Sequence, residues 1–291
     1  MGQYSIKELE KLSGIKAHTI RIWEKRYQLI APGRTDTNIR LYSDHDLKKI
    51  INVAIANNAG VKISHIARLS NDELTRLVSE KSSSGGEMAS PIDQLVVAMV
   101  ELDEPTFDRV LTKLAQSMGF EDLITQVVYP FLEKIGILWQ TGNITPAQEH
   151  FISNLVRQKM MVAIDGLPYP PASSPKAVLF LQENEYHEIG LLFYCFLVKK
   201  YNIRPIYLGQ SVPYQDLLHV VKAHNPKYLI TSIVTTLNQD IFHDYFNKLS
   251  QDFPKQTILV SGQAAQQLEV GRYPKIRHFG SAQALKSFLK G

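Results

Sequence analysis

Short apolar runs alternate with longer helix-like segments over the last part of the chain, from 176 to 291. Apolar runs of four or five residues between amphipathic helices are typical of buried parallel strands. The spacing therefore predicts an α/β domain with a doubly wound parallel sheet. The predicted strands are Ala177–Leu181, Pro205–Leu208, Tyr228–Thr231, Thr257–Val260 and Ile276–Phe279.

Helical periodicity dominates the middle of the chain, from 91 to 167. Apolar residues recur at helical spacing over 92–100 and again over 107–114. A third helix is predicted over 123–138, interrupted at its proline. A fourth begins after Thr145, where Thr, Pro and Gln form N-terminal capping signals. Four consecutive helices predict a four-helix bundle.

The first 76 residues alternate short amphipathic helices with turn signals. Ser5 and Glu8 form a capping box for the first helix, and a second helix is predicted over 17–27. Residues 29–42 carry turn signals and predict a small hairpin. Helix, tight turn, helix and hairpin together predict an all-α winged helix-turn-helix head over 1–76.

Two segments without apolar periodicity separate these domains. Residues 77–90 are rich in Ser and Gly and predict a flexible linker, and the proline-rich segment 167–175 predicts an extended spacer. The predicted fold class is therefore multidomain: a winged helix-turn-helix head, a four-helix bundle over 91–167, and an α/β domain over 176–291.

Composition agrees with a globular protein, with 44% apolar and 21% charged residues. No apolar run reaches membrane-spanning length, and the first residues lack a signal-peptide pattern, so we expect a cytoplasmic protein with no membrane partner. Cys195, the only cysteine, lies in an apolar run and is expected in the core.

Positive charge is concentrated in the head. The net charge of the chain is +4, and residues 1–76 carry +5 while the rest carries −1. A basic excess on one domain indicates contact with a polyanion, although such an imbalance is commonly just a solvated surface.

Three segments of the head, Thr19–Tyr27, Arg34-Thr35 and Arg40–Ser43, resemble the DNA-binding domain of MerR-type regulators. The resemblance implies double-stranded operator DNA as a partner, with the second helix in the major groove and the hairpin at the neighbouring backbone. Trp23 is expected in the head core rather than on a base. The implied DNA-binding residues are Thr19, Arg21, Lys25, Arg26, Tyr27, Arg34, Arg40 and Tyr42.

The head departs from that family at three positions. Gln28 and Asn38 stand where the family usually has glycine, and Asn tolerates a left-handed backbone better than Gln does. Lys16 stands where a Ser or Asp helix cap is expected. These departures are expected to alter operator preference and to leave the fold intact.

A polar motif, Glu185-Tyr186-His187-Glu188-Ile189-Gly190, follows the first predicted strand of the α/β domain. Ligands bind at the carboxyl ends of strands in such sheets. His187 can offer a ring nitrogen to a metal while Glu185 holds the other N–H, and Gly190 lets a ligand approach the backbone. Taken alone, a loop histidine beside a glutamate is more often a solvated polar pair.

With Ser232-Ile233-Val234 and Gly262, this motif resembles the cobalamin-binding, flavodoxin-like domains of methionine synthases, mutases and cobalamin-dependent regulators. The resemblance implies that His187 is the lower axial ligand of cobalt. It further implies that Ser232 binds the dimethylbenzimidazole tail, for which Gly262 makes room. Glu185 replaces the family's Asp, and Gln263 replaces its second glycine. The implied cofactor-binding residues of this domain are Glu185, His187, Gly190, Ser232, Val234 and Gly262.

In the bundle, Trp139 is followed after nine residues by Glu149-His150, which resembles the helical cap of light-sensing cobalamin regulators of the CarH/LitR type. The resemblance implies that Trp139 and Glu149 cover the upper face of adenosylcobalamin or methylcobalamin. His150 is expected to orient Glu149 or to contact the corrin. The alternative is that Trp139 packs in the core of the bundle and that Glu149 and His150 are surface charges on a capped helix. Gln140 counts against light sensing, because some relatives have a cobalt-binding histidine there.

The sequence as a whole predicts a transcriptional regulator, a repressor, that is not an enzyme and senses cobalamin, with light as a further option. Self-association as a dimer or tetramer is expected, since two half-sites bring affinity and register. One alternative is a MerR-type regulator with a degenerate cobalamin site that responds to a protein antagonist or another ligand. The other is a corrinoid carrier subunit of an enzyme, against which the DNA-binding head argues.

Overall fold

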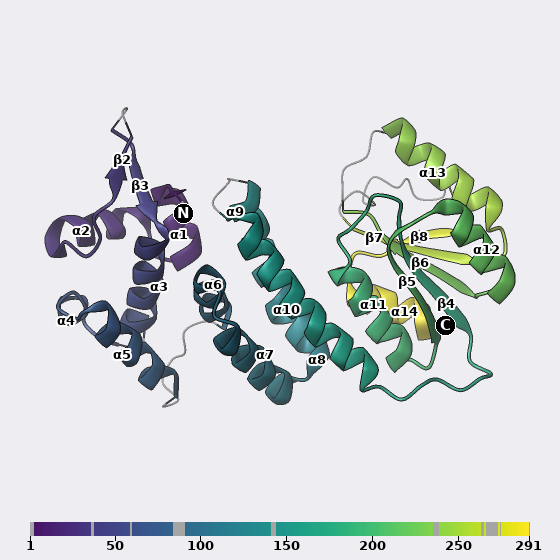
Figure 1. The fold of residues 1–291 in the computed structure, drawn as a ribbon, viewed down its shortest axis with the longest axis horizontal. Coiled ribbons are helices and arrows are strands. Elements are labelled where there is room, and N and C mark those ends of the chain that lie inside the picture. Colours follow the sequence, from purple (N-terminus) through teal and green to yellow (C-terminus); the bar gives the residue numbers. More distant parts are fainter. Residues whose placement is uncertain are drawn as a thin grey trace. The chain divides into compact units, whose positions relative to one another are not determined.

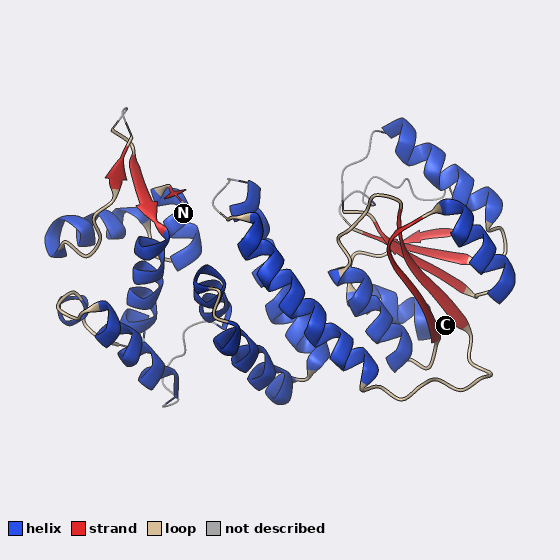
Figure 2. Cartoon of the chain, viewed as in Figure 1, coloured by secondary structure: helices blue, strands red, loops and turns tan. Residues whose placement is uncertain are grey.

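The computed structural model describes residues 3–35, 38–58, 60–83, 91–140, 144–234, 239–262, 265, 273 and 275–290 (Figure 1, Figure 2). The chain forms two compact units, 1–155 and 156–291, and the division falls inside the helix that begins at Pro146. Within the described ranges, every helix is too short or too polar to span a lipid bilayer.

The head is a group of short helices with a small antiparallel sheet of order β1-β3-β2, in which β2 and β3 form the predicted hairpin wing (Figure 1). Strand β1 was not predicted from the sequence; it pairs with β3 through Tyr4 and Tyr42, which are both buried. The elements are β1 (Gln3–Tyr4), α1 (Ile6–Ser13), α2 (Ala17–Tyr27), β2 (Gly33–Arg34), β3 (Arg40–Ser43), α3 (Asp44–Asn58), α4 (Ile63–Ile66) and α5 (Asn71–Ser83).

Local hydrogen bonds explain where the head helices begin. The Ser5–Glu8 capping box of α1 is present as predicted. Lys16 supplies no cap to α2; instead the Glu10 carboxylate accepts from the backbone N–H of Ala17 at 3.0 Å. This bond, and Lys16 Nζ at 3.1 Å, lower the pKa of Glu10. The missing cap is therefore replaced from the preceding helix.

Helix α5 corrects the predicted linker. Ser70 and Glu73 form a capping box at its start, and Leu74 is buried. The helix then continues to Ser83, so the prediction of an irregular linker from residue 77 is wrong for 77–83. The rest of that linker, 84–90, lies outside the described residues.

The bundle consists of four consecutive helical segments, as predicted. Its core includes Phe107, whose ring centroid lies 5.8 Å from that of Phe131 and 6.5 Å from that of Phe151. The third segment changes from α-helix to π-helix and back just before its proline, at the predicted interruption. The elements are α6 (Pro91–Glu101), α7 (Glu104–Met118), α8 (Phe120–Asp122), η1 (Leu123–Val128), α9 (Tyr129–Gln140) and α10 (Pro146–Asp165).

The second unit contains a parallel sheet of order β5-β4-β6-β7-β8, with α11 and α14 over one face and α12 and α13 over the other (Figures 1 and 2). This order is the flavodoxin-like one and confirms the predicted α/β fold. The elements are β4 (Lys176–Gln182), α11 (Ile189–Lys200), β5 (Arg204–Val212), α12 (Tyr214–His224), β6 (Tyr228–Ser232), α13 (Gln239–Asp252), β7 (Thr257–Ser261), β8 (Ile276–His278) and α14 (Ala282–Lys290).

Apolar side chains fill both faces of the inner strands β4, β6 and β7, because helices cover the sheet on both sides. Val178, Leu229 and Ile258 pack against Phe242 and Phe246 of α13. On the α11 side, Cys195 is buried as predicted, and burial raises the pKa of its thiol to about 12, so the thiol stays protonated.

Candidate functional site

The Glu185 carboxylate lies buried in the loop after β4, with 1% of its side chain exposed. Its Oε1 accepts hydrogen bonds from the backbone N–H groups of Tyr186 and His187, at 3.0 and 3.1 Å. Its Oε2 accepts from the backbone N–H of Val234 at 3.1 Å. Hydrogen bonds of this kind compensate the burial of a carboxylate. The loop is therefore held around Glu185.

The imidazole of His187 is held by the same carboxylate. Its Nδ1 lies 2.6 Å from Glu185 Oε1, while 65% of the side chain is exposed. A carboxylate at Nδ1 places the ring proton there, so Nε2 carries the lone pair of the neutral ring. This is the arrangement by which proteins orient a metal-binding histidine. The extra methylene of Glu185, compared with Asp, does not prevent the contact.

The Glu185–Val234 bond spans the point where the strand order reverses, between β4 and β6. Crevices for ligands form at such switch points, outside the carboxyl ends of the strands. Ser232 is buried at the end of β6, where its backbone pairs with Ser261 of β7. Three of the predicted site residues, Glu185, His187 and Val234, are thus brought together, with Ser232 two residues away in the chain.

Strand β5 continues to Val212, beyond the predicted strand end at Leu208, and this extension borders the histidine loop. The Ser211 hydroxyl accepts from the backbone N–H of Asn184, and the Ser211 N–H donates to the Glu185 carbonyl. Gln210 donates its side-chain amide to the Tyr186 carbonyl at 3.0 Å. These bonds fix the histidine loop from the β5 side as well.

The two predicted glycines are needed for different reasons. At Gly262, φ is +97° and a Cβ would lie 2.2 Å from the Ile233 carbonyl oxygen, so the fold itself excludes any side chain there. At Gly190, the nearest atom to a Cβ would be the Tyr194 hydroxyl at 3.7 Å, an ordinary contact. Packing within the protein therefore does not require glycine at 190. Gln263 lies outside the described residues.

A partly buried ion pair next to the histidine, in which Glu188 is buried and the Arg157 side chain is 36% exposed, was missed from the sequence. Glu188 is 5% exposed; its Oε2 accepts from the Tyr207 hydroxyl at 2.8 Å, and its Oε1 lies 2.6 Å from Arg157 Nη2 of α10. The Arg157 contact is an ion pair rather than an aligned hydrogen bond. Burial and the Glu188 carboxylate raise the pKa of Tyr207 above its ordinary range. This pair attaches α10 to the start of α11.

In the bundle, α10 begins with reciprocal bonds between Thr145 and Gln148, as its capping signals predict. The Glu149 carboxylate accepts from the Ser153 hydroxyl at 2.6 Å and lies 2.9 Å from His150 Nδ1. This geometry agrees with His150 orienting Glu149. The side chains of Trp139 and Gln140 lie outside the described residues.

The second helix of the head presents the predicted DNA-binding side chains on one face. Arg21, Lys25 and Arg26 are exposed, whereas Trp23 is buried, in agreement with its predicted place in the core. The guanidinium carbon of Arg26 lies 5.4 Å from the Tyr27 ring centroid, within cation–π range. Thr19 and Tyr27 are half-buried at the edges of this face.

Two of the predicted DNA-binding residues have internal roles. Arg40 Nε lies 3.1 Å from both carboxylate oxygens of Glu24, which joins the wing to α2. Tyr42 is fully buried and its hydroxyl donates to Glu24 at 3.3 Å, so the prediction that it contacts DNA is corrected to a structural role. Arg34 is exposed on the wing and donates to Asn38 Oδ1 at 2.7 Å.

Backbone angles explain the family departures. Gln28 has φ of 50° and Asn38 has φ of 64°, so both adopt the left-handed backbone that favours glycine. Helix α2 still ends at Gln28, whose N–H donates to the Glu24 carbonyl. The head therefore keeps the turns without the glycines.

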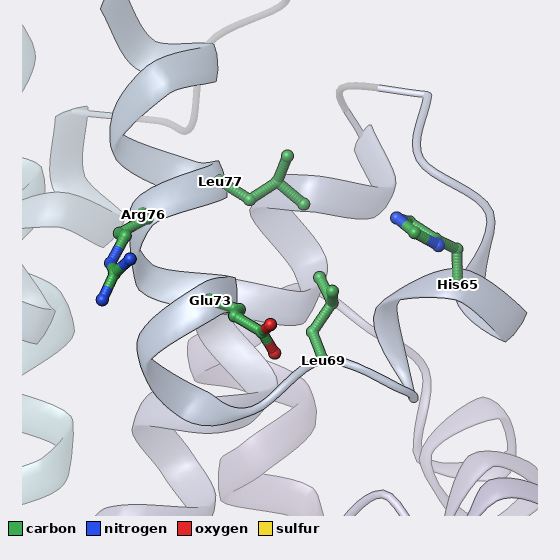
Figure 3. Close-up of a pocket in the computed structure, with 5 residues that line it drawn as sticks. All are labelled: His65, Leu69, Glu73, Arg76 and Leu77. Carbon is green, nitrogen blue, oxygen red and sulfur yellow. The ribbon is translucent and has the colours of Figure 1, made fainter.

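A shallow pocket lies elsewhere in the head, between α4 and α5 (Figure 3). Figure 3 shows the Glu73 carboxylate beside Leu69, while the Arg76 side chain points away from the other four lining residues. None of these residues belongs to the predicted sites.

Similarity to known protein families agrees with this geometry. Residues 4–73 match the family described as MerR HTH family regulatory protein, and residues 91–163 match the B12 binding domain. The second match covers the helical bundle rather than the sheet. The predicted resemblances of the head and of the helical bundle are therefore confirmed at the level of domains.

Two curated relatives resemble most of the chain. The HTH-type transcriptional repressor CarH of Myxococcus xanthus is 29% identical over 269 residues, which cover 90% of this chain and 89% of that protein. The HTH-type transcriptional repressor CarA of the same organism is 29% identical over 210 residues, covering 72% and 68%. Both relatives are repressors rather than enzymes, in agreement with the prediction.

Among solved structures, a monomethylamine corrinoid protein of Methanosarcina barkeri shares the fold. Its TM-score is 0.58 at 17% identity, over 69% of this chain and 97% of that one. At this identity the likeness supports the fold alone.

Proposed function

Since the chain is a MerR-type regulator with a B12 binding domain, we propose that it is a repressor whose hold on operator DNA depends on cobalamin bound at His187. The observation that carries this proposal is the 2.6 Å contact between His187 Nδ1 and the buried Glu185 carboxylate. It orients an exposed imidazole, with its lone pair on Nε2, at the switch point of the sheet.

The residues of the second unit are proposed to hold the corrinoid. A neutral imidazole is a good ligand for a transition metal, so His187 would hold cobalamin, which when bound would supply a cobalt ion able to accept that ring nitrogen. Glu185 keeps the His187 ring in one tautomer and one orientation. Gly190 leaves room for the bulky macrocycle at the first turn of α11. Ser232 and Gly262 are proposed to border the dimethylbenzimidazole tail, and Val234 to line the approach to it.

The upper face is assigned to the bundle on the resemblance to CarH-type regulators. Glu149, oriented by His150, is proposed to accept from the hydroxyls of an adenosyl group, with Trp139 packed on that group. Adenosylcobalamin and methylcobalamin are both candidate forms. Light is proposed as a signal only through adenosylcobalamin, and Gln140 makes capture of cobalt by the residue after Trp139 unfavourable.

The head is proposed to bind double-stranded DNA as part of a dimer or tetramer in the cytoplasm. Arg21, Lys25 and Arg26 on α2 and Arg34 on the wing supply positive charge to phosphates. Thr19 and Tyr27 border this face, and Arg40 is held beside it by Glu24. Cobalamin is proposed to change how bundles pack between protomers, which decides whether two heads engage DNA together.

Reconstitution tests the cofactor assignment. The purified chain is incubated in the dark with adenosylcobalamin or methylcobalamin, desalted, and examined by absorbance and by size-exclusion chromatography before and after illumination. We expect retained corrin bands in the natural chain and their loss in His187→Ala. Folded protein that keeps no corrin would contradict the proposal and favour a regulator that responds to a protein antagonist or another ligand.

A further inference from the structure

The exposed face of α2 has an apolar side chain at its centre. The exposed residues of this helix follow the spacing i, i+3, i+4, i+7 and i+8, which defines one continuous face. Ile22 is 52% exposed in the middle of this face. The exposed residues are His18, Arg21, Ile22, Lys25 and Arg26.

The head core does not account for Ile22. The opposite side of α2 is buried through Ile20, at 0% exposed, and Trp23, at 8%. Successive residues of an α-helix are rotated by about 100° around its axis, so Ile22 lies about 200° from Ile20 and about 100° from Trp23. Its side chain therefore points away from the core that these two residues enter. Helix α2 therefore buries Ile20 and Trp23 in the core and exposes the Ile22 side chain to solvent.

Charge around Ile22 is of one sign. Arg21, Lys25 and Arg26 share its face, while Glu24, the only acid of α2, is turned toward the wing, where it contacts Arg40 and Tyr42. A protein partner is a poorer match for this face, because it would have to oppose these cations with aspartate or glutamate, which are depleted at the centres of protein interfaces. A polyanion that also offers an apolar group is the better match.

The major groove of DNA offers such a group. Phosphates line its edges, and the C5 methyl of thymine is the apolar feature among the base edges. From these observations, and resting on the proposed DNA binding, we propose that Ile22 is a specificity-determining residue that packs on a thymine methyl group. The cations beside it bind phosphates and fix the register, while Ile22 reads one base pair in each half-site.

Deoxyuridine substitution tests this inference directly, because it removes the thymine methyl and changes nothing else on the base edge. A high-affinity duplex is first selected from random-sequence DNA with the full-length protein. Each thymine is then replaced by deoxyuridine in turn, and affinity is measured at fixed salt. We expect one thymine per half-site at which the replacement weakens binding about fourfold, the effect of one buried methyl group.

The same thymine and deoxyuridine duplexes are then measured with three variants of the protein. Ile22→Ala is expected to bind the thymine and deoxyuridine duplexes equally, while keeping the salt dependence of the natural protein. Arg21→Ala should keep the methyl effect and lower the salt slope by about 1. Ile39→Ala, which removes a 59% exposed isoleucine from the wing, is the matched apolar control and should keep the methyl effect. Thermal unfolding confirms that each variant is folded.

The outcomes separate the two proposals. If the natural protein enriches no sequence, DNA binding itself fails and the inference fails with it. If a sequence is enriched but no deoxyuridine weakens binding, or if Ile22→Ala retains the effect, DNA binding stands and the role of Ile22 is wrong.

Discussion

Glu185 Oε2 accepts the backbone N–H of Val234 at 3.1 Å, which joins the loop after β4 to the end of β6. The other oxygen of the same carboxylate holds His187 Nδ1. One buried group therefore closes the loop onto the sheet and also sets the direction of the imidazole. The structural roles of Glu185 and His187 and their proposed role in ligand binding can be separated by mutation.

Glu185→Ala is expected to lower the free energy of unfolding by about 2–3 kcal/mol, because it leaves buried backbone N–H groups without their acceptor. His187→Ala should change it by less than about 1 kcal/mol, because its side chain is 65% exposed. Both variants should lose corrin retention. Urea unfolding and absorbance after desalting measure the two effects, and a large stability loss in His187→Ala would contradict the assignment.

Substitutions at Gly262 and Gly190 also separate an effect on stability from an effect on corrin retention. Gly262→Ala should cost about 3 kcal/mol or more, because its Cβ would overlap the Ile233 carbonyl and φ is positive. Gly190→Ala should be neutral or stabilise the fold by up to about 1 kcal/mol, since it lies in the first turn of α11. We nevertheless expect Gly190→Ala to weaken corrin retention. Equal retention in Gly190→Ala and the natural chain would place the ligand away from this helix.

Much of this arrangement could be predicted from the sequence. The three inner strands β4, β6 and β7 are buried and read as apolar runs, which is why the parallel sheet could be recognised. The edge strands β5 and β8 are more exposed and were found from their place between predicted helices. The ends of β4 and β6 then locate Glu185, His187 and Val234 at one edge of the sheet. The capping boxes at Ser5 and Thr145 were likewise visible, because both partners lie within three residues.

Contacts between distant residues could not be predicted. Glu24 meets Arg40 and Tyr42 across 16 and 18 residues, so a pattern that marks Tyr42 as part of a DNA-binding motif does not show that it is buried. Glu188 reads as a surface acid until Arg157 and Tyr207 are brought to it by the fold. Helix α5 was not predicted, because the serine-rich composition of its second half favoured a linker.

Arg157→Met tests the ion pair with Glu188. It leaves the Glu188 charge with Tyr207 alone and should lower the free energy of unfolding by about 1–3 kcal/mol. Adding Glu188→Gln removes the charge and should recover part of this loss, giving a coupling energy of about 1–2 kcal/mol in a double-mutant cycle. Urea unfolding of the four proteins measures it. Additive effects would show that the 2.6 Å contact contributes nothing to stability.

Alanine substitutions of Arg21 and Arg40, two cations of the DNA-binding head, should differ in their effect on stability. Arg21→Ala should weaken DNA binding and leave stability unchanged, because the side chain is exposed. Arg40→Ala should also destabilise the head by about 1 kcal/mol, because it breaks the two contacts with Glu24. Gel shifts over a salt series and urea unfolding distinguish them. Unchanged affinity and salt slope in both variants would contradict the groove assignment.

The contribution of Asp103 to the stability of the bundle should depend on pH. It caps α7 by accepting from the Thr106 backbone N–H at 3.1 Å, and hydrogen bonding by the Thr106 side chain and backbone lowers the pKa of the Asp103 carboxyl. A lowered pKa in the folded state means that the stabilisation is complete above the unfolded value of about 3.9 and is lost as the pH falls through the folded value. At pH 7, Asp103→Ala should cost about 1 kcal/mol.

Asp103→Asn is the matched control, because asparagine caps a helix about as well as aspartate and does not titrate in this range. We expect the natural chain and Asp103→Asn to have similar free energies of unfolding at pH 7. The difference between them should turn against the natural chain as the pH falls below about 3.9, where only aspartate becomes protonated. Urea unfolding at a series of pH values measures this difference. A difference that stays constant with pH would show that the ionised carboxylate contributes nothing beyond the hydrogen bond itself.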